Sequence, residues 1–125
     1  MSNKIVTDKA PGAIGPYSQA VTVGNLVFTS GQIPLDPETG LLVGDTVTEQ
    51  THRACKNLSA VLRAAGSGLD KAVKTVCFLA DIADFAAFNE VYTQYFTEKP
   101  ARSCVAVKEL PRGALVEIEV VAEKS

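Results

Sequence analysis

The sequence predicts an α+β domain in which two helices cover one face of a single β-sheet. Apolar residues recur at helical spacing in two segments, and short β-branched runs precede, separate and follow these segments. The chain has 125 residues, of which 46% are hydrophobic and 21% are charged. This is the size and composition of one globular domain with its own core, and we expect residues 1–125 to form it.

Three strands are expected before the first helix. Lys4–Thr7 is predicted to be a short edge strand, and Ser18–Val23 and Leu26–Ser30 are predicted to form a hairpin. Gly24-Asn25 indicates the hairpin, because two residues of this type between β-rich runs favour a tight turn. The whole stretch Ala10–Leu35 carries no charge, but its four glycines and three prolines exclude a membrane-spanning helix.

The first helix has a well-defined start. Thr46 and Glu49 have the spacing of a capping box, and Gly66 and Gly68 supply the stop. Between them apolar residues recur at a period of about 3.6 residues. They are Val47, Thr51, Ala54, Leu58, Val61, Leu62 and Ala65. Cys55 lies off this stripe, and no role is expected for it.

The next strand and helix follow directly. Val73–Ala80 is a continuous apolar and β-branched run, which predicts a strand covered on both faces. Asp81 or Asp84 can cap the second helix, and Pro100 closes the segment. The apolar stripe of this helix consists of Phe85, Phe88, Val91, Tyr92, Tyr95 and Phe96.

Arg102–Val107 and Leu115–Ala122 are predicted to be the last two strands. The simplest packing places both helices on one face of the sheet. The other face then needs a cover, and a chain of this length has no third helix to provide it. We therefore expect the protein to oligomerise through this face.

Charge and cysteine usage argue against two kinds of site, although the net charge does not forbid a local basic patch. Twelve Lys and Arg oppose fourteen Asp and Glu, for a formal net charge of −2, which argues against nucleic-acid binding. The three cysteines form no CxxC pair and no Cys/His cluster, so no metal site is expected. Free thiols and a polar Met1–Asp8 segment without a secretory signal favour the cytoplasm and leave a mitochondrial pool open.

The last two strands carry the polar residues that could perform chemistry. Alternation places Arg102 and Cys104 on one face of their strand. Glu117 and Glu119 share a face of the other strand. These charges form either a solvated or ion-paired surface, or a small anion site. In the second case Arg102 holds a carboxylate and a nearby glutamate orients water.

Cysteine and histidine offer weaker candidates. Arg102 would lower the thiol pKa of Cys104 and make it more nucleophilic, whereas the alternative is a small apolar filler. Cys77 lies between apolar residues and is expected in the core. His52 is the single histidine, and its surroundings in the sequence suggest no Ser/His/Asp or Cys/His arrangement.

Five segments occur together and span most of the chain. They are AIGPYSQAV (Ala13–Val21), LVFTSGQIP (Leu26–Pro34), FLADIADFAAFNEVYTQYF (Phe78–Phe96), PARSCVAV (Pro100–Val107) and VEIE (Val116–Glu119). With these segments the chain resembles the RidA/YjgF family of reactive-intermediate (imine/enamine) deaminases, in its eukaryotic-type members. The resemblance implies a chorismate-mutase-like mixed sheet with two helices on one face. It also implies a homotrimer in which the sheets enclose a central barrel and three sites lie in clefts between subunits.

The resemblance implies a hydrolase without metal or cofactor. The implied enzyme is a 2-iminobutanoate/2-iminopropanoate deaminase, which converts small 2-imino or enamino acids, such as 2-aminoacrylate, to 2-oxo acids and ammonia. Two alternatives remain from other classes. One is an endoribonuclease or translation inhibitor, and the other is a non-catalytic, small-ligand-binding or chaperone-like trimer. No membrane partner is expected.

The resemblance also assigns roles to individual positions. Arg102 would clamp the substrate carboxylate, and Glu117 would hold the attacking water and assist proton transfer. Glu119 lies on the same strand face, so the sequence does not decide whether Glu117 acts alone. The remaining positions implied to bind substrate are Tyr17, Ser30, Gly31, Asn89 and Cys104.

Overall fold

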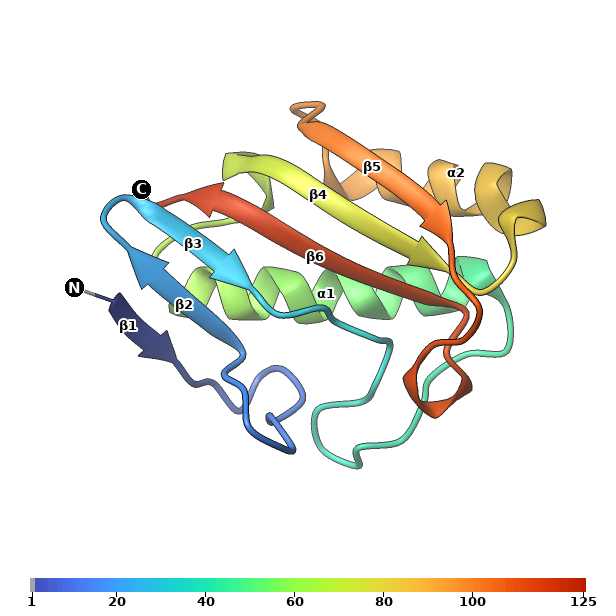
Figure 1. Cartoon of the computed structure of the whole chain (residues 1–125), viewed down its shortest axis with the longest axis horizontal. Helices are drawn as coiled ribbons and strands as arrows, with labels where there is room; N and C mark the ends of the chain where they lie inside the picture. The colour runs from blue at the N-terminus through green and yellow to red at the C-terminus, as the bar shows by residue number, and fades with distance from the viewer. Residues whose placement is uncertain (1) are drawn as a thin grey trace.

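The computed structural model describes residues 2–125 and contains one six-stranded sheet and two α-helices (Figure 1). This confirms the predicted α+β class. The strands are β1 (Ser2–Ile5), β2 (Ala20–Val23), β3 (Leu26–Thr29), β4 (Ala72–Leu79), β5 (Ala101–Ala106) and β6 (Val116–Glu123). The helices are α1 (Val47–Ala64) and α2 (Phe85–Tyr95), and short 3₁₀ turns occupy Leu69–Lys71, Ile82–Asp84 and Pro111–Gly113.

The first strand is shifted from its predicted position, from Lys4–Thr7 to Ser2–Ile5. Its partner explains the shift, because β2 pairs with it from Ser2 to Ile5. Beyond that point the backbone N–H of Thr7 donates instead to the side chain of Gln19. A side chain therefore ends the strand.

The sheet is mixed, as the family resemblance implied. Its strand order is β1-β2-β3-β6-β4-β5, and every pair is antiparallel except β4 with β5. A parallel pair requires a crossover, and α2 lies in the segment that makes it. β6, the last strand in the sequence, fills the centre between β3 and β4.

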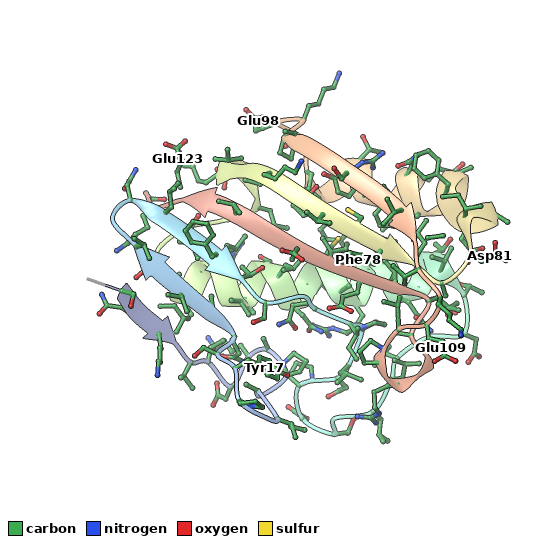
Figure 2. All side chains as sticks on the ribbon, in the orientation of Figure 1. Tyr17, Phe78, Asp81, Glu98, Glu109 and Glu123 are labelled. Atoms are coloured by element: carbon green, nitrogen blue, oxygen red, sulfur yellow. The ribbon has the colours of Figure 1, made fainter. Side chains whose placement is uncertain are left out.

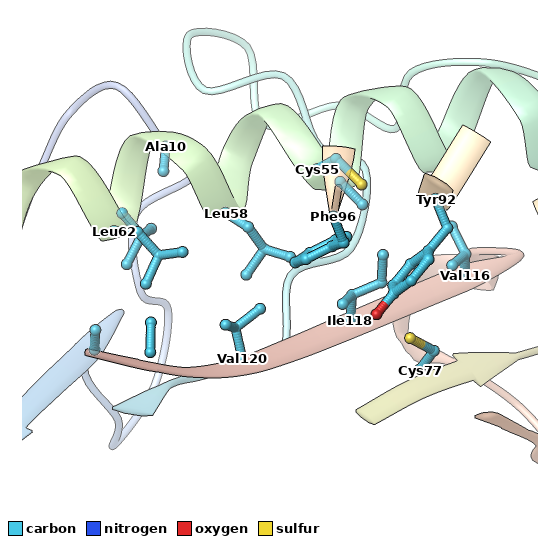
Figure 3. Close-up of a cluster of buried hydrophobic side chains, with 14 of the residues drawn as sticks. Ala10, Cys55, Leu58, Leu62, Cys77, Tyr92, Phe96, Val116, Ile118 and Val120 are labelled. Carbon is cyan, nitrogen blue, oxygen red and sulfur yellow. The ribbon is translucent and has the colours of Figure 1, made fainter. Parts of the chain in front are cut away.

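Helix α1 begins at the predicted capping box. Thr46 Oγ1 accepts the backbone N–H of Glu49, and the Glu49 carboxylate accepts the backbone N–H of Thr46. Its inner face is buried with the central strand, where Leu58 and Leu62 belong to the same cluster as Ile118 (Figure 3). Fully burying a leucine contributes about 1.5–3 kcal/mol, so this layer is a main source of stability.

Helix α2 closes the other half of the core. Asp84 occupies the N-cap position without a side-chain hydrogen bond, whereas Asp81 accepts the backbone N–H of Ala83 in the preceding 3₁₀ turn. The aromatic rings of the helix pack in series, with Tyr92 stacked on Phe96 at a centroid distance of 4.5 Å. The helix thus contributes rings to the core where α1 contributes aliphatic side chains.

Cys55 is fully buried, contrary to the expectation from the stripe of α1. The reason is tertiary. Helix α2 packs against α1, so the buried face of α1 is wider than its sheet-facing stripe. Burial raises the pKa of the Cys55 thiol far above its ordinary value, and the thiol stays protonated.

The two faces of the sheet differ. Thr75, Cys77 and Leu79 of β4 point toward the helices and are buried, whereas Val76 and Phe78 point away from them and are only partly covered. In Figure 1 both helices lie behind the sheet, and within residues 2–125 no helix covers the front. The prediction that this strand is covered on both faces is therefore wrong for the single chain.

No helix in the described part of the chain is both long and apolar enough to cross a membrane.

Candidate active site

The candidate site begins at an irregularity between β3 and β6. Phe28 pairs with Val121, but Gln32, four residues later, pairs with Ile118, only three residues before Val121. The β3 side thus accommodates one extra residue within the segment 29–31. Such a bulge changes the direction in which the neighbouring side chains point, and bulges are common beside active sites.

Gly31 lies in this bulge directly against the side chain of Glu117. A β-carbon at residue 31 would lie 2.8 Å from Glu117 Cδ and 3.0 Å from Cγ, and it would overlap the carboxylate oxygen Oε2. A real β-carbon essentially never lies this close to a non-bonded atom, so Glu117 keeps its place only because residue 31 has no side chain. Here glycine is required for close approach and not for an unusual backbone angle.

The carboxyl group of Glu117 has an altered environment. The side chain is half-buried, and burial together with the neighbouring Glu119 carboxylate raises the pKa of Glu117 above its ordinary value. Both glutamates project from the helix-free face of β6, as their pairing with Phe78 and Val76 requires. A carboxylate with a raised pKa is a better proton acceptor than an ordinary one.

A hollow of about 390 Å³, which we call the Glu117 hollow, opens beside these carboxylates. Its lining includes Tyr17, Ser30 and Gly31, three of the residues expected to bind substrate. Tyr17 is about half exposed, in the loop that leads into β2 (Figure 2). The hydroxyl of Ser30 donates to the carbonyl of Ser18 at 2.6 Å, so only its oxygen lone pairs remain for a ligand.

Arg102 does not reach this hollow, because it lies on the opposite face of the sheet. In the parallel ladder Arg102 pairs with Thr75, which faces the helices, whereas Glu117 pairs with Phe78 on the helix-free face. The interpretation that Arg102 and a nearby glutamate form one anion site is therefore wrong within a single chain. The predicted alternation of side chains along β5 and along β6 was correct. It could not show whether the face that carries Arg102 and the face that carries Glu117 lie on the same side of the sheet.

The guanidinium of Arg102 is enclosed by one side of α2. Its Nη1 donates to Asn89 Oδ1 at 2.7 Å, and its Cζ lies 4.8–5.9 Å from the ring centroids of Phe85, Phe88 and Tyr92. Asn89 is its only hydrogen-bond acceptor among the described residues. A half-buried arginine with one neutral partner retains N–H donors that a carboxylate can bind.

Cys104 lies beside Arg102 on the edge strand and pairs in register with Cys77. Burial raises the pKa of the Cys104 thiol, and the positive charge of Arg102 offsets only part of this effect. The geometry thus favours the filler interpretation over an activated nucleophile. Cys77 is fully buried, as predicted.

His52 lies elsewhere. Its Nδ1 is 2.8 Å from the hydroxyl of Tyr95, between the two helices. Within residues 2–125, no three His, Cys, Asp or Glu side chains come together as a metal-binding group.

Sequence reasoning did not single out three residues that line the Glu117 hollow, namely Thr29, Ile33 and Pro111. Thr29 supports the bulge, because its Oγ1 accepts the backbone N–H of Val120 at 2.9 Å. A threonine immediately before Ser30 and Gly31 was the available signal. Its role depends on pairing with a strand some ninety residues later, which local patterns do not reveal.

Comparison with known proteins gives consistent similarities over nearly the whole chain. Residues 7–124 match the family described as Endoribonuclease L-PSP. A RutC family protein of Saccharolobus solfataricus is 53% identical over 126 residues, with full coverage of both chains. A human protein named 2-iminobutanoate/2-iminopropanoate deaminase is 51% identical over 119 residues, which cover 94% of this chain and 87% of the human one.

The same similarity appears in three dimensions. The crystal structure of E. coli TdcF with bound serine superposes with a TM-score of 0.92 at 46% sequence identity, covering 98% of this chain and 99% of TdcF. Sequence and architecture therefore agree along the entire length that carries the hollow and Arg102.

Proposed function

The chain belongs to the Endoribonuclease L-PSP family, also known as the RidA/YjgF family, and from this premise we propose that it is an imine deaminase. Its substrates would be small 2-imino or enamino acids, and its products 2-oxo acids and ammonia. The human relative is named for such a reaction, whereas other relatives are named only as RutC family proteins. The observation that carries the proposal is the half-buried Glu117 carboxylate, seated against Gly31 beside an open hollow.

Glu117 is suited to activate water. The raised pKa of its carboxyl group makes it a stronger base, and the adjoining hollow has room for a small substrate and one water. The Glu117 carboxylate accepts a proton as the water oxygen bonds to the imine carbon. The electron pair of the C=N bond moves to nitrogen, and Glu117 returns the proton to that nitrogen, which gives an amine and a hydroxyl on the same carbon. Glu117 then takes the hydroxyl proton and passes it to the amine, so the C–N bond breaks with its electron pair on nitrogen, ammonia leaves, and the C–O bond becomes the carbonyl of a 2-oxo acid.

Arg102 is suited to hold the substrate carboxylate. Its guanidinium is enclosed by aromatic rings and an amide without a charged partner, and a carboxylate would supply the missing charge. TdcF is described with bound serine, a molecule that also carries a carboxylate and an amino group next to each other. Because binding energy that is equal in substrate and transition state does not raise kcat, Glu117 must supply the transition-state contribution.

Arg102 and Glu117 can meet only across a subunit boundary, because the sheet separates them within one chain. The helix-free face exposes several large apolar side chains, including Phe28 and Val105, and would be buried in an oligomer. We therefore propose a homotrimer in which Arg102, on the edge strand β5 of one subunit, approaches the Glu117 hollow of the next. Asn89 and Cys104 would then form one wall of the site, and Tyr17, Ser30 and Gly31 the other.

A coupled assay tests the proposal. Threonine dehydratase generates the imine in situ, and its decay is followed with and without this protein. We expect faster decay with the wild type, a kcat lowered by about 10²–10⁴-fold in Glu117→Gln, and loss of activity in Arg102→Ala with the oligomer intact. Glu123→Gln, on the exposed end of the same strand, is the matched control and should behave as the wild type. Wild-type protein that is folded and oligomeric but leaves imine decay unchanged would overturn the proposal.

The alternative functions make different predictions in the same preparations. The family description favours an endoribonuclease, but the single histidine is bonded to Tyr95 between the helices and does not line the Glu117 hollow. RNA cleavage that is lost in Arg102→Ala would support that alternative. Binding of 2-oxo acids without any acceleration of imine decay would support a non-catalytic binding protein.

A further inference from the structure

Four side chains on one side of α2 surround Arg102. Phe85, Phe88, Asn89 and Tyr92 occupy positions i, i+3, i+4 and i+7, which lie above one another on a helix. Three supply ring faces to the guanidinium, and the fourth supplies an amide oxygen. We call this group the arginine cradle. The contacts of the guanidinium with its ring and amide partners therefore come from one side of a single helix.

Tyr92 is the best-fixed member of the cradle. Its ring is the nearest of the three, 4.8 Å from Arg102 Cζ, and it is stacked on Phe96 on one side and tilted against Phe88 on the other. Its hydroxyl is 2.7 Å from Thr75 Oγ1, and both residues are buried. Burial raises the pKa of Tyr92, so the ring carries no competing negative charge next to the arginine.

Thr75 connects this ring to the strand that carries the arginine. It pairs in register with Arg102 in the parallel ladder and points to the same side of the sheet. Thr75 thus contacts both partners. Its backbone pairs with that of Arg102, and its hydroxyl holds the hydroxyl of Tyr92.

We propose that Tyr92 and Thr75 are positioning residues for Arg102, and that the arginine cradle orients the guanidinium for a ligand carboxylate before the ligand arrives. The identity of the ligand as an imino acid rests on the function proposed above. The cradle itself requires only that Arg102 binds a carboxylate. Holding a flexible arginine in one conformation removes the entropy cost that binding would otherwise carry, and the ring faces favour the cation.

Conservative substitutions test this inference. Tyr92→Phe and Thr75→Val each remove the hydroxyl with little change of volume, and Tyr92→Leu removes the ring face as well. Tyr95→Leu is the matched control, because Tyr95 is on the same helix and also loses one hydroxyl partner, but it contacts His52 and not Arg102. The measurements are kcat and KM for the imine, and the dissociation constant of unreactive 2-oxobutanoate by calorimetry.

Tyr92→Leu should raise both KM and the 2-oxobutanoate dissociation constant by about 3- to 30-fold, the range that a cation–π contact is worth, with a smaller effect on kcat. Tyr92→Phe should restore most of this loss. Tyr92→Phe and Thr75→Val combined should cost no more than either alone, because they remove the same hydrogen bond. Tyr95→Leu should lower thermal stability and leave both binding measurements unchanged.

The outcomes separate the cradle from the proposed function. Unchanged 2-oxobutanoate binding in Tyr92→Leu, or equal loss in Tyr95→Leu, would overturn the cradle while imine hydrolysis by the wild type could stand. A wild type that binds 2-oxobutanoate in a Tyr92-dependent way but hydrolyses no imine would sustain the cradle and overturn the deaminase. If Tyr92→Leu does not fold, Thr75→Val decides. Binding of 2-oxobutanoate as tight as in the wild type would overturn the positioning role, and losses that add in the combined Tyr92→Phe and Thr75→Val variant would contradict a shared hydrogen bond. A wild type that binds no 2-oxobutanoate would overturn the cradle as a ready-made carboxylate site, whereas the deaminase would still be decided by the decay of the imine.

Discussion

At the scale of single residues, the candidate site depends on a side chain that is absent. Gly31 leaves the space that the Glu117 carboxyl group occupies, and the bulge of β3 brings the two into contact. The place of the half-buried Glu117 carboxyl group therefore depends on the backbone at residue 31. Substitutions here should act on activity more than on folding.

Gly31→Ala is expected to displace the Glu117 carboxyl group, because its β-carbon would overlap Oε2. Activity should fall by about 10²-fold or more, as for removal of a general base, while thermal stability changes little because the displaced side chain can turn toward solvent. Steady-state kinetics and a melting curve check this. Gly24→Ala provides a control glycine, since nothing lies near its β-carbon, and its positive φ should cost stability but not activity. Full activity in Gly31→Ala would contradict the role of the close contact.

The pH dependence follows from the electrostatics of the two glutamates. Glu117 must be ionised to accept a proton, so activity should rise with pH through its raised pKa and then level off. Burial is the larger cause of the shift, and the charge of Glu119 adds to it. Glu119→Gln removes that charge, so the pKa of Glu117 should fall. The rise of kcat/KM on the acid side of the pH profile, which we call the acid limb, should then move to lower pH.

The measurement is the pH profile of kcat/KM for the wild type and Glu119→Gln with the same substrate. The substrate titrates in the same way in both measurements. A difference between the two profiles therefore reports a change in the pKa of a group on the enzyme. Glu123→Gln should leave the limb where it is. A limb that moves to higher pH in Glu119→Gln would be inconsistent with Glu117 as the base.

At the scale of elements, a buried glutamine organises the loop before β2. Gln19 is almost fully buried, and its side chain accepts the backbone N–H of Thr7 and donates to the carbonyls of Thr7, Ala10 and Pro11. It therefore ends β1 and fixes the loop that precedes Tyr17. From Ala10 onward this loop is uncharged and rich in glycine and proline, and it has little regular structure of its own, so a side chain supplies its hydrogen bonds.

Gln19→Leu should lower the free energy of unfolding by about 2–4 kcal/mol, because several buried or partly buried backbone groups lose their partners at once. Gln94→Leu is the control, since Gln94 is exposed and bonds only to the preceding turn of its helix. Urea unfolding at a fixed protomer concentration compares the two, because dissociation of an oligomer would otherwise contribute. Equal stability of the two variants would show that Gln19 does not hold the loop.

At the scale of the whole molecule, the sheet has one face for the core and another without cover. Arg102 lies on the first face at an edge strand, and Glu117 lies on the second near the centre. Under the function proposed above, a single chain would therefore carry two halves of a site that cannot meet. A symmetric assembly would solve this, because every interface would pair one half with the other.

Subunit mixing tests the composite site. Arg102→Ala and Glu117→Gln proteins should each be inactive, but co-expression of the two should restore activity. With random mixing in equal amounts, about a quarter of the sites would combine an intact Arg102 with an intact Glu117 from the neighbouring subunit. Mass spectrometry of the intact oligomer verifies mixing. Mixed oligomers with no recovered activity would place Arg102 and Glu117 outside a shared site.

Local patterns along the chain predicted most of the helices and strands, and the family motifs supplied the candidate site residues. The capping box of Thr46 and Glu49 fixed the start of α1, the Gly24-Asn25 turn fixed the hairpin, and the family motifs selected Arg102 and Glu117. These signals are local, because capping, turns and periodicity involve residues a few positions apart. They can therefore be identified without knowing the order of the strands in the sheet.

The relations between elements became visible in the folded chain alone. Its tertiary structure placed Cys55 in the core, put Arg102 and Glu117 on opposite faces, and brought Gly31 onto Glu117. Each of these results depends on β6, the last strand in the sequence, lying between β3 and β4, or on α2 lying against α1. Contacts between such distant segments are set by the packing of the whole chain, and alternation along one strand contains no information about them.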